Sequence, residues 1–448
     1  MYNLPDDEIL PLSMDHNFWT WSAQSKVDVI PLKKAEGVYF WDVNGKRYLD
    51  FNSMVMNVNI GHGDKRVEEA IIKQVSELST TGPHMATRPR AYLGKLLTEI
   101  TQGKFNHFLY TLGGSDANEN AIKLARMYTG KQKILSRYRS YHGATYGAIA
   151  VTGDPRRVAW EPMVMPGVVH FLDPYRYRST FHQNQPNVDE ATFSQDYLNH
   201  LEEIIKYEGP QTIAAILLET VTGTNGIIIP PAGYLQGVRE ICDHYNILMI
   251  ADEVMSGFGR TGKWFAVDNW GVTPDLMTMA KGLTSGYAPL GAVAIPEKIY
   301  QFFEDKVFHG GLTYNGHPIS LAAAIAVLQV MQQDHVVEKA ASTGTVMSEM
   351  MAELVDRHPS IGEVRSIGLF GAIELVRDRK TREPLAPFNG SSPEMVALSK
   401  KCKELGLYIH THWNVILLIP PLIITPDQLE EGFNILDNAL TIADAAAK

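Results

Sequence analysis

The chain has 448 residues, a formal net charge of −10, 45% hydrophobic residues and 20% charged residues. This length suffices for a buried core and for two or three domains, and the composition is that of an ordinary globular protein. The negative charge argues against nucleic acid or an anionic membrane surface as the main partner. The two cysteines, Cys242 and Cys402, form no CxxC pattern, which indicates a reducing compartment and excludes a metal site of paired thiolates.

Neither end of the sequence shows a targeting or membrane-spanning pattern. The first residues lack a basic stretch followed by an apolar core, so a signal peptide is not expected. The apolar run VILLIPPLIIT near the C-terminus is interrupted by Pro420 and Pro421 and is too short to cross a bilayer. We therefore expect a cytoplasmic protein without a membrane partner.

The first 60 residues are expected to form an N-terminal arm followed by a hairpin of a small domain. Residues 1–36 have mixed polarity and contain the aromatic stretch FWTW. In the next segment, VYFWDVNGKRYLDF, Asn44 and Gly45 separate two β-rich runs. An Asn-Gly pair supplies the positive φ angles of a type I′ turn, so this segment is predicted to be a β-hairpin.

Between residues 61 and 325, short apolar runs alternate with helical segments, as in a large α/β domain. Expected strands lie at residues 106–112, 133–138, 212–220, 247–251, 276–280 and 288–296. Residues 154–197, rich in Pro, Tyr and Arg, show little periodicity and are predicted to be a long surface excursion. Residues 326–448 mix helices near 335–357 and 393–405 with short strands, so we expect them to complete the small α+β domain.

Two of the expected strands are each followed by one ionisable residue, Asp252 and Lys281. Because ligands bind at the carboxyl ends of strands in open α/β sheets, both side chains are expected to face one crevice. A desolvated lysine can lose its proton and form a Schiff base, and an aspartate can keep a pyridinium nitrogen protonated. The pair is therefore a candidate site for pyridoxal 5′-phosphate (PLP). A solvated loop lysine and a helix-capping aspartate would give the same pattern.

Three more segments lie at expected strand ends. Residues 113–115, Gly-Gly-Ser, stand between a strand and a helix, where backbone N–H groups can bind a phosphate. Tyr141, in the sequence Tyr-His-Gly, could stack on a flat cofactor, or it could be a core tyrosine. Glu219 could contact a cofactor or pair with an arginine, or it could be a solvated turn residue.

Taken together and in this order, the segments resemble the class III, or ω-type, aminotransferases of the fold type I PLP enzymes. The resemblance extends from about residue 30 to about residue 430, and its motifs are GGSDANENAIKLAR, SYHG, ADEVMSGFGRTG, AKGLTSGYAPLGAV and LTYNGHP. It implies a large domain with a mostly parallel seven-stranded sheet, and a small domain built from both chain ends. It also implies a homodimer, or a tetramer of two dimers, with sites shared across the interface.

The resemblance also implies a role for each matching residue. Lys281 would bind PLP covalently and then carry protons, Asp252 would pair with the pyridine nitrogen, and Tyr141 would stack on the ring. A metal site is not expected. The other residues expected to bind the cofactor are Gly114, Ser115, His142, Glu219, Val254 and Thr313, the last reaching the phosphate of the neighbouring subunit.

The sequence departs from the family pattern where the acid group of a substrate is commonly held. Many members have an arginine three residues before the Pro-Pro pair, but this position is Leu417 here, so a bidentate clamp is missing. The alternatives are Arg156 or Arg157 in TGDPRR, and His410 or His412, each of which could also be an ordinary structural or surface residue. Residues expected at the substrate entrance are Phe18, Trp21, Met54 and Val55.

Within the family, FWTWSAQ, YFWDVNGKRYLDF, VNIGHG, RYRSYHGAT and TGDPRR look most like the taurine-type members. These transfer the amino group of taurine to 2-oxoglutarate or pyruvate by a ping-pong mechanism. We therefore predict a taurine aminotransferase, with another ω-amine (β-alanine, 4-aminobutyrate or a diamine) as the alternative donor. A decarboxylase or aminomutase on the same scaffold is a further alternative. An NAD-dependent dehydrogenase is unsupported, because the first strand is not followed by a GxGxxG motif and a later acid.

Overall fold

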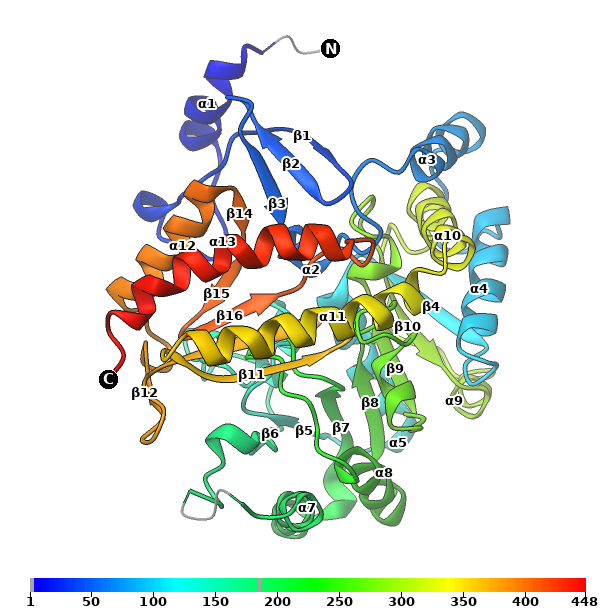
Figure 1. Cartoon of the computed structure of the whole chain (residues 1–448). Helices are drawn as coiled ribbons and strands as arrows, with labels where there is room; N and C mark the ends of the chain where they lie inside the picture. Colours follow the sequence, from blue (N-terminus) through cyan, green and yellow to red (C-terminus); the bar gives the residue numbers. More distant parts are fainter. Residues whose placement is uncertain (1–3, 184–186) are drawn as a thin grey trace.

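Three β-sheets organise the part of the chain that the computed structural model describes, residues 4–183 and 187–448 (Figure 1). The largest sheet has seven strands in the order β4-β10-β9-β8-β7-β5-β6. β10 runs antiparallel to β4 and β9 and the other neighbours are parallel, so the predicted mostly parallel seven-stranded sheet is confirmed. The strands are β4 (His107–Thr111), β5 (Lys133–Arg137), β6 (Val168–Phe171), β7 (Ile213–Glu219), β8 (Leu248–Asp252), β9 (Leu276–Met279) and β10 (Gly291–Ile295).

This sheet is buried on both faces, which explains why its strands read as continuous apolar runs. In β8, Leu248 and Ile250 pack in one cluster with α5 (Gly114–Thr129). Met249 belongs to another cluster, with α7 (Glu190–Glu208) and α8 (Tyr234–Tyr245). Because successive side chains of a strand point to opposite faces, these clusters are two helical layers that hold the sheet between them.

A further group of helices supports the turn that carries Lys281. α10 (Pro318–Gln333) packs against α3 (Lys65–Glu77) and α4 (Arg88–Ile100). α10 also contacts the short 3-10 helix Lys281–Leu283 that follows β9. α10 is apolar around most of its circumference and largely buried, as expected for a helix inside a large domain.

The two ends of the chain meet in the smaller sheets (Figure 1). β14 (Leu407–Tyr408) pairs in parallel with β3 (Arg47–Asp50), next to β2 (Tyr39–Asp42) and β1 (Leu32–Glu36). The third sheet contains β11 (Ile361–Ile367), β12 (Phe370–Asp378), β13 (Glu383–Pro384), β15 (His410–His412) and β16 (Val415–Leu418). The helices around these sheets are α11 (Val336–Arg357), α12 (Pro393–Leu405) and α13 (Pro426–Asp444). The domain boundaries drawn at residues 60 and 325 stay a prediction.

The hairpin β2–β3 is present, but its turn differs from the predicted type I′ turn. Gly45 has a positive φ of 81°, whereas Asn44 is not among the residues with positive φ. The side chain of Asp42 organises the turn instead, because its Oδ1 accepts hydrogen bonds from the N–H groups of Asn44 and Lys46 at 2.9 and 3.0 Å. An aspartate that bonds the backbone two residues later is a common way to form a turn.

The prediction of a surface excursion over residues 154–197 was wrong in part. β6 pairs in parallel with β5 at the edge of the large sheet, and its four residues are too few to show a period. α7 begins at Glu190, after Asp189, whose side chain accepts a hydrogen bond from the N–H of Thr192. Residues 184–186 of this segment and residues 1–3 of the arm lie outside the described part.

Short helices complete the described structure: α1 (Ile9–His16), α2 (Ser53–Met56), α6 (Tyr146–Val151) and α9 (Glu297–Phe302). α2 contains a kink at Met54, which has a φ of 56°. Among the helices of residues 4–183 and 187–448, none is both long enough and apolar enough to cross a membrane.

Candidate active site

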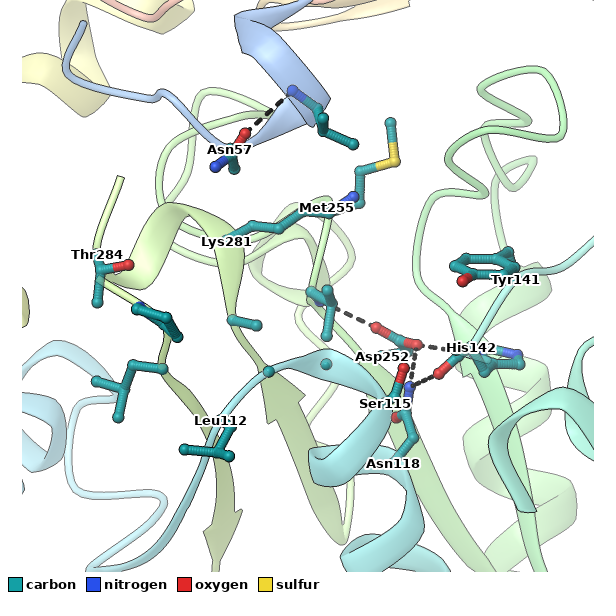
Figure 2. A pocket seen from close by; sticks show the side chains of 18 of the residues that line it. Asn57, Leu112, Ser115, Asn118, Tyr141, His142, Asp252, Met255, Lys281 and Thr284 are labelled. Atoms are coloured by element: carbon teal, nitrogen blue, oxygen red, sulfur yellow. Dashed lines mark hydrogen bonds and ion pairs between the residues drawn. The ribbon is translucent and has the colours of Figure 1, made fainter. Parts of the chain in front are cut away.

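A cavity of about 420 Å³ lies at the carboxyl ends of the central strands (Figure 2). Glu219 and Asp252 are the last residues of β7 and β8, and Lys281 follows β9; all three line the cavity. The volume is within the range of about 300–1,000 Å³ that is usual for small-molecule sites. The residues that the sequence placed at strand ends are therefore brought to one place, as expected for an open α/β sheet.

Lys281 is held in an unusual backbone conformation, with a φ of 41°. Burial lowers the pKa of its amino group from 10.5 to about 8, and the nearby carboxylates of Glu219 and Asp252 oppose this shift. A lysine with such a pKa is partly neutral near physiological pH, and only the neutral amine is a nucleophile. Lys281 is thus not the solvated loop lysine that was the alternative interpretation.

Asp252 is fixed by three hydrogen bonds from other parts of the site. Its Oδ2 accepts from Nδ2 of Asn118 at 2.8 Å and lies 2.7 Å from Nδ1 of His142, and its Oδ1 accepts from the N–H of Val254 at 3.0 Å. Asn118 also accepts a hydrogen bond from the hydroxyl of Thr278 at 2.8 Å. Figure 2 shows Asp252, His142 and Asn118 together, with Tyr141 above them in this view. A carboxylate held this way keeps both its position and its direction.

The start of α5 and the loop after β5 come unusually close to each other. A Cβ added to Gly143 would lie 2.3 Å from Oγ of Ser115, and one added to Gly114 would lie 2.8 Å from Cγ1 of Val254. The N–H of Ala144 donates to Oγ of Ser115 at 3.2 Å. Because the first N–H groups of a helix lack intrahelical partners, this cradle of glycines at a helix N-terminus is suited to a phosphate group.

Glu219 and Tyr141 form another side of the cavity. The carboxylate of Glu219 is buried and accepts hydrogen bonds from the N–H groups of Tyr141 at 3.0 Å and Gly223 at 2.6 Å. Burial raises the pKa of Glu219, while His142 and the two backbone donors act in the opposite direction. Glu219 is therefore not a solvated turn residue. The ring of Tyr141 lines the cavity and contacts Trp21 edge-on, with 5.6 Å between the ring centroids.

Arg156 places a positive charge next to this wall. Its guanidinium lies 3.9 Å from the centroid of the Tyr141 ring and 5.3 Å from that of Trp21. The side chain is ion-paired with Asp154 and donates to the hydroxyl of Thr224 at 3.1 Å. Thr224 lines the cavity, so a single side chain stands between Arg156 and the cavity.

Several residues expected at the substrate or cofactor are not among those that line the cavity: Phe18, Trp21, Met54, Arg156, Thr313 and His412. Burial lowers the pKa of His412 to about 3, so this side chain is neutral at physiological pH. Thr313 is exposed between α9 and α10. Leu417 is fully buried in an apolar cluster that includes Met255, a residue of the cavity wall. Val55, predicted near the entrance, does line the cavity.

The sequence argument from strand ends did not identify Asn118 and Thr278. Asn118 is on α5, and Thr278 is the residue of β9 that pairs with Asp252. A signal was present for Thr278, because it is a polar residue inside an apolar strand. For Asn118 the signal was its spacing of one helical turn from the glycine start of α5.

The donor set fits PLP. The cavity combines a glycine-lined helix start for a phosphate, a fixed carboxylate, an aromatic wall and a lysine whose pKa is lowered toward neutrality. Among the described residues, His, Cys, Asp and Glu side chains form no cluster suited to a metal ion. Phosphate, ring nitrogen, ring face and aldehyde of the cofactor each find a group of complementary chemistry.

Comparisons with known proteins agree with this geometry. The model of the class III aminotransferase family matches residues 21–440. A taurine–pyruvate aminotransferase of Bilophila wadsworthia is 35% identical over 429 residues, 92% of each chain. A putrescine–pyruvate aminotransferase of Pseudomonas aeruginosa is 33% identical over 448 residues, 97% of this chain and 96% of the relative. The structure of taurine:2-oxoglutarate aminotransferase from Bifidobacterium kashiwanohense, in complex with PLP and glutamate, is 42% identical with a TM-score of 0.96 and covers 99% of both chains. The chain belongs to the class III aminotransferases, enzymes that use PLP.

Proposed function

We propose that this aminotransferase takes the amino group of taurine and passes it to 2-oxoglutarate, or to pyruvate, in two half-reactions at one site. The observation that carries the taurine assignment is the guanidinium of Arg156, 3.9 Å from the ring centroid of Tyr141 at the cavity wall. A sulfonate on a short chain needs a cation at a fixed distance from the reacting carbon, and a guanidinium can donate two N–H groups to it. The similarity to two taurine aminotransferases supports the same choice.

Lys281 is assigned the covalent and proton-transfer roles. PLP, when bound, withdraws electrons from the amino-bearing carbon of the substrate and makes its proton acidic. Nζ of Lys281 would hold the cofactor between turnovers, and its free amine would accept the proton of the amino-bearing carbon. The lowered pKa of Lys281, about 8, keeps an appreciable fraction of the released amine neutral and ready to accept it.

The other cavity residues position the cofactor in this proposal. Asp252, oriented by Asn118 and His142, pairs with the pyridine nitrogen and keeps it protonated. Tyr141 covers one face of the ring and excludes water from it. The phosphate is held by Gly114 and Ser115, and Val254, Glu219 and His142 support the ring and its neighbours.

We propose that the active unit is a homodimer. Thr313 is exposed and does not line the cavity of its own chain, which fits a phosphate contact made to the neighbouring subunit. Trp21 is 65% exposed although it contacts Tyr141, so part of the arm remains to be covered. Light scattering on the purified protein should give twice the chain mass or a multiple of it, and an active monomer would contradict this proposal.

We also place the enzyme in the cytoplasm, because both free cysteines are buried and unpaired within the described residues.

A diamine donor is the second candidate, and a specific observation favours it. Leu417 and Met255 belong to one buried apolar cluster, so this wall offers no cation to an acid group. A donor without an acid group leaves no anion unpaired against this wall, and the second amine of a diamine would have to pack there in its neutral form or extend to solvent. The similarity to a putrescine–pyruvate aminotransferase points in the same direction.

The two candidates are separated by comparing kcat/KM for taurine, β-alanine, 4-aminobutyrate and putrescine, each with 2-oxoglutarate and with pyruvate. The matched variant is Arg156→Gln, which removes the charge and keeps much of the side chain. If Arg156 binds the sulfonate, this variant raises KM for taurine roughly tenfold or more and changes KM for putrescine little. A higher kcat/KM for putrescine in the unmodified enzyme would overturn the taurine assignment. Continued product formation over many turnovers without any keto acid would indicate a decarboxylase or aminomutase instead, because an aminotransferase stops after one product per site.

A further inference from the structure

A second cavity, of about 440 Å³, shares no lining residue with the active-site cavity. Three arginines line it: Arg139, Arg157 and Arg178. We call it the arginine pocket. Arg156 and Arg157 are neighbours on one short helix, yet Arg156 lies over Tyr141 of the active site whereas Arg157 lines the arginine pocket. The remaining lining residues are Tyr138, Gly153, Pro155, Val158, Leu172, Asp173, Tyr175, Thr180, Tyr197 and Phe388.

The positive charges of the arginine pocket are not balanced by its own carboxylates. Asp173 is the acidic residue of the lining, and it lies 3.6 Å from Arg137 and accepts the backbone N–H of Arg139 at 2.7 Å. Arg157 pairs with Glu161 at 3.1 Å, and Arg178 pairs with Glu374 at 2.7 Å. With these charges paired, the guanidinium of Arg139 is the one in the described lining that needs a partner.

Arg139 has no ion pair within residues 4–183 and 187–448. Its one side-chain hydrogen bond there is long, 3.5 Å from Nη1 to the carbonyl oxygen of Asn225. The guanidinium instead lies 5.0, 5.1 and 5.5 Å from the ring centroids of Tyr175, Phe388 and Trp413. Burial lowers the pKa of Arg139, as expected for a cation taken from water without a full partner.

Stacking on aromatic rings uses the faces of a guanidinium and leaves its N–H groups free to donate at the edge. In the same pocket, Nη2 of Arg178 is buried and finds no hydrogen-bond acceptor among the described residues. The unused donors of Arg139 thus belong to a residue that lines the cavity, and Arg178, which lines it too, has one buried donor without an acceptor in the described part of the chain. The walls of the cavity include the rings of Tyr138, Tyr175, Tyr197 and Phe388. Such donors are costly to leave unsatisfied, and a carboxylate accepts from them in pairs.

We propose that the arginine pocket is a second ligand site, separate from the substrate site, which binds a small organic carboxylate with a flat or apolar body. The carboxylate accepts hydrogen bonds from Arg139 and Arg178, with Arg157 adding charge at the pocket wall. The flat or apolar body of the ligand lies against Tyr138, Tyr175 and Phe388. This contact would shield the three rings from water. The proposal does not depend on which amine the enzyme uses.

Benzoate is a suitable probe, because it carries no amino or keto group that the enzyme could convert. Isothermal titration of the PLP-loaded enzyme with benzoate should show binding, and Arg139→Gln should weaken it roughly tenfold or more. Arg157→Gln, at another position of the pocket wall, should weaken binding as well, so a folding defect in the first variant does not remove the test. Arg156→Gln is the matched control: it removes the neighbouring charge on the active-site side and should leave this binding within about twofold.

Three results would overturn the proposal. One is the absence of benzoate binding to the unmodified enzyme. Another is binding that is lost in Arg156→Gln and kept in Arg139→Gln and Arg157→Gln, which would place benzoate in the substrate site. The third is binding of inorganic phosphate to the pocket without binding of benzoate, which would show that the aromatic walls do not contribute.

Discussion

Lys281 combines a positive φ of 41° with a position just after the carboxyl end of β9, a buried strand inside the large sheet. Non-glycine residues adopt such angles rarely, and they keep them where the surrounding structure imposes them, often at functional sites. Replacing Lys281 with Ala should lower kcat by at least about 10²–10⁴-fold, because the proton acceptor is lost. Steady-state kinetics and a thermal unfolding control would test this. A near-native rate in a folded Lys281→Ala protein is incompatible with the proposed roles.

The pKa of Lys281 gives a pH prediction. Burial lowers this pKa from 10.5 to about 8, so in the cofactor-free protein the neutral amine increases as the pH rises toward 8 and is nearly complete above it. Only the neutral amine attacks the aldehyde of PLP. The rate at which the cofactor-free protein takes up PLP should therefore rise with pH through about 8, where half of the amine is neutral, and level off about one unit above it. A rate that keeps rising toward pH 10.5 would show that burial does not perturb Lys281.

At the scale of elements, the contact between α5 and the loop after β5 depends on Gly143. Gly143 has a φ of 134°, and a Cβ there would lie 2.3 Å from Oγ of Ser115. Gly143→Ala should push the loop away from the start of α5 and weaken PLP binding by roughly tenfold or more, with a smaller effect on unfolding. Gly82→Ala is a control, because a Cβ at Gly82 meets nothing within 4 Å. Equal PLP dissociation constants in the two variants would refute this role of the loop.

The end of α11 is tied to α13 through one histidine. Nδ1 of His358 lies 2.7 Å from Asp444 and Nε2 lies 2.9 Å from Asp437, both on α13. Each nitrogen of the ring faces a carboxylate, so its removal takes one partner from Asp437, which keeps Arg357, and one from Asp444, which keeps Ser360. His358→Ala should lower the free energy of unfolding by about 1–3 kcal/mol. Urea unfolding measures this, and Lys400→Ala, at a side chain that is 74% exposed, should change it by less than about 0.5 kcal/mol.

Elements with complete local signals could be predicted from the sequence. α12 occupies residues 393–405, as predicted, because it starts with a proline in its first turn and stops at Gly406 in a left-handed conformation. β6 and the start of α7 were missed, since a four-residue edge strand shows no period.

The site residues with a local sequence signal could likewise be predicted. Lys281 and Asp252 were found from strand ends, whereas the contact between Asn118 and Asp252 joins residues 134 positions apart and depends on the tertiary fold.

In the whole molecule, positive charge is concentrated locally although the protein is acidic. The net charge is −10, yet arginines gather where the large sheet meets the strands of the third sheet. Arg156 lies over the ring of Tyr141, which lines the active-site cavity, and its neighbour Arg157 lines the arginine pocket. Local cations of this kind bind anions even when the overall field repels them, because charges that are partly buried are screened less by salt. The affinity for an anionic donor should therefore depend less on ionic strength than the affinity of a site on the exposed surface would.

The most direct test is a single half-reaction. The PLP-loaded enzyme is mixed with taurine in the absence of any keto acid, the visible absorption of the bound cofactor is recorded, and sulfoacetaldehyde is measured. Our proposal predicts that the absorption band disappears and that about one sulfoacetaldehyde forms per active site, as expected for a ping-pong reaction. A band that ignores taurine but disappears with putrescine would contradict the taurine assignment and support a diamine donor.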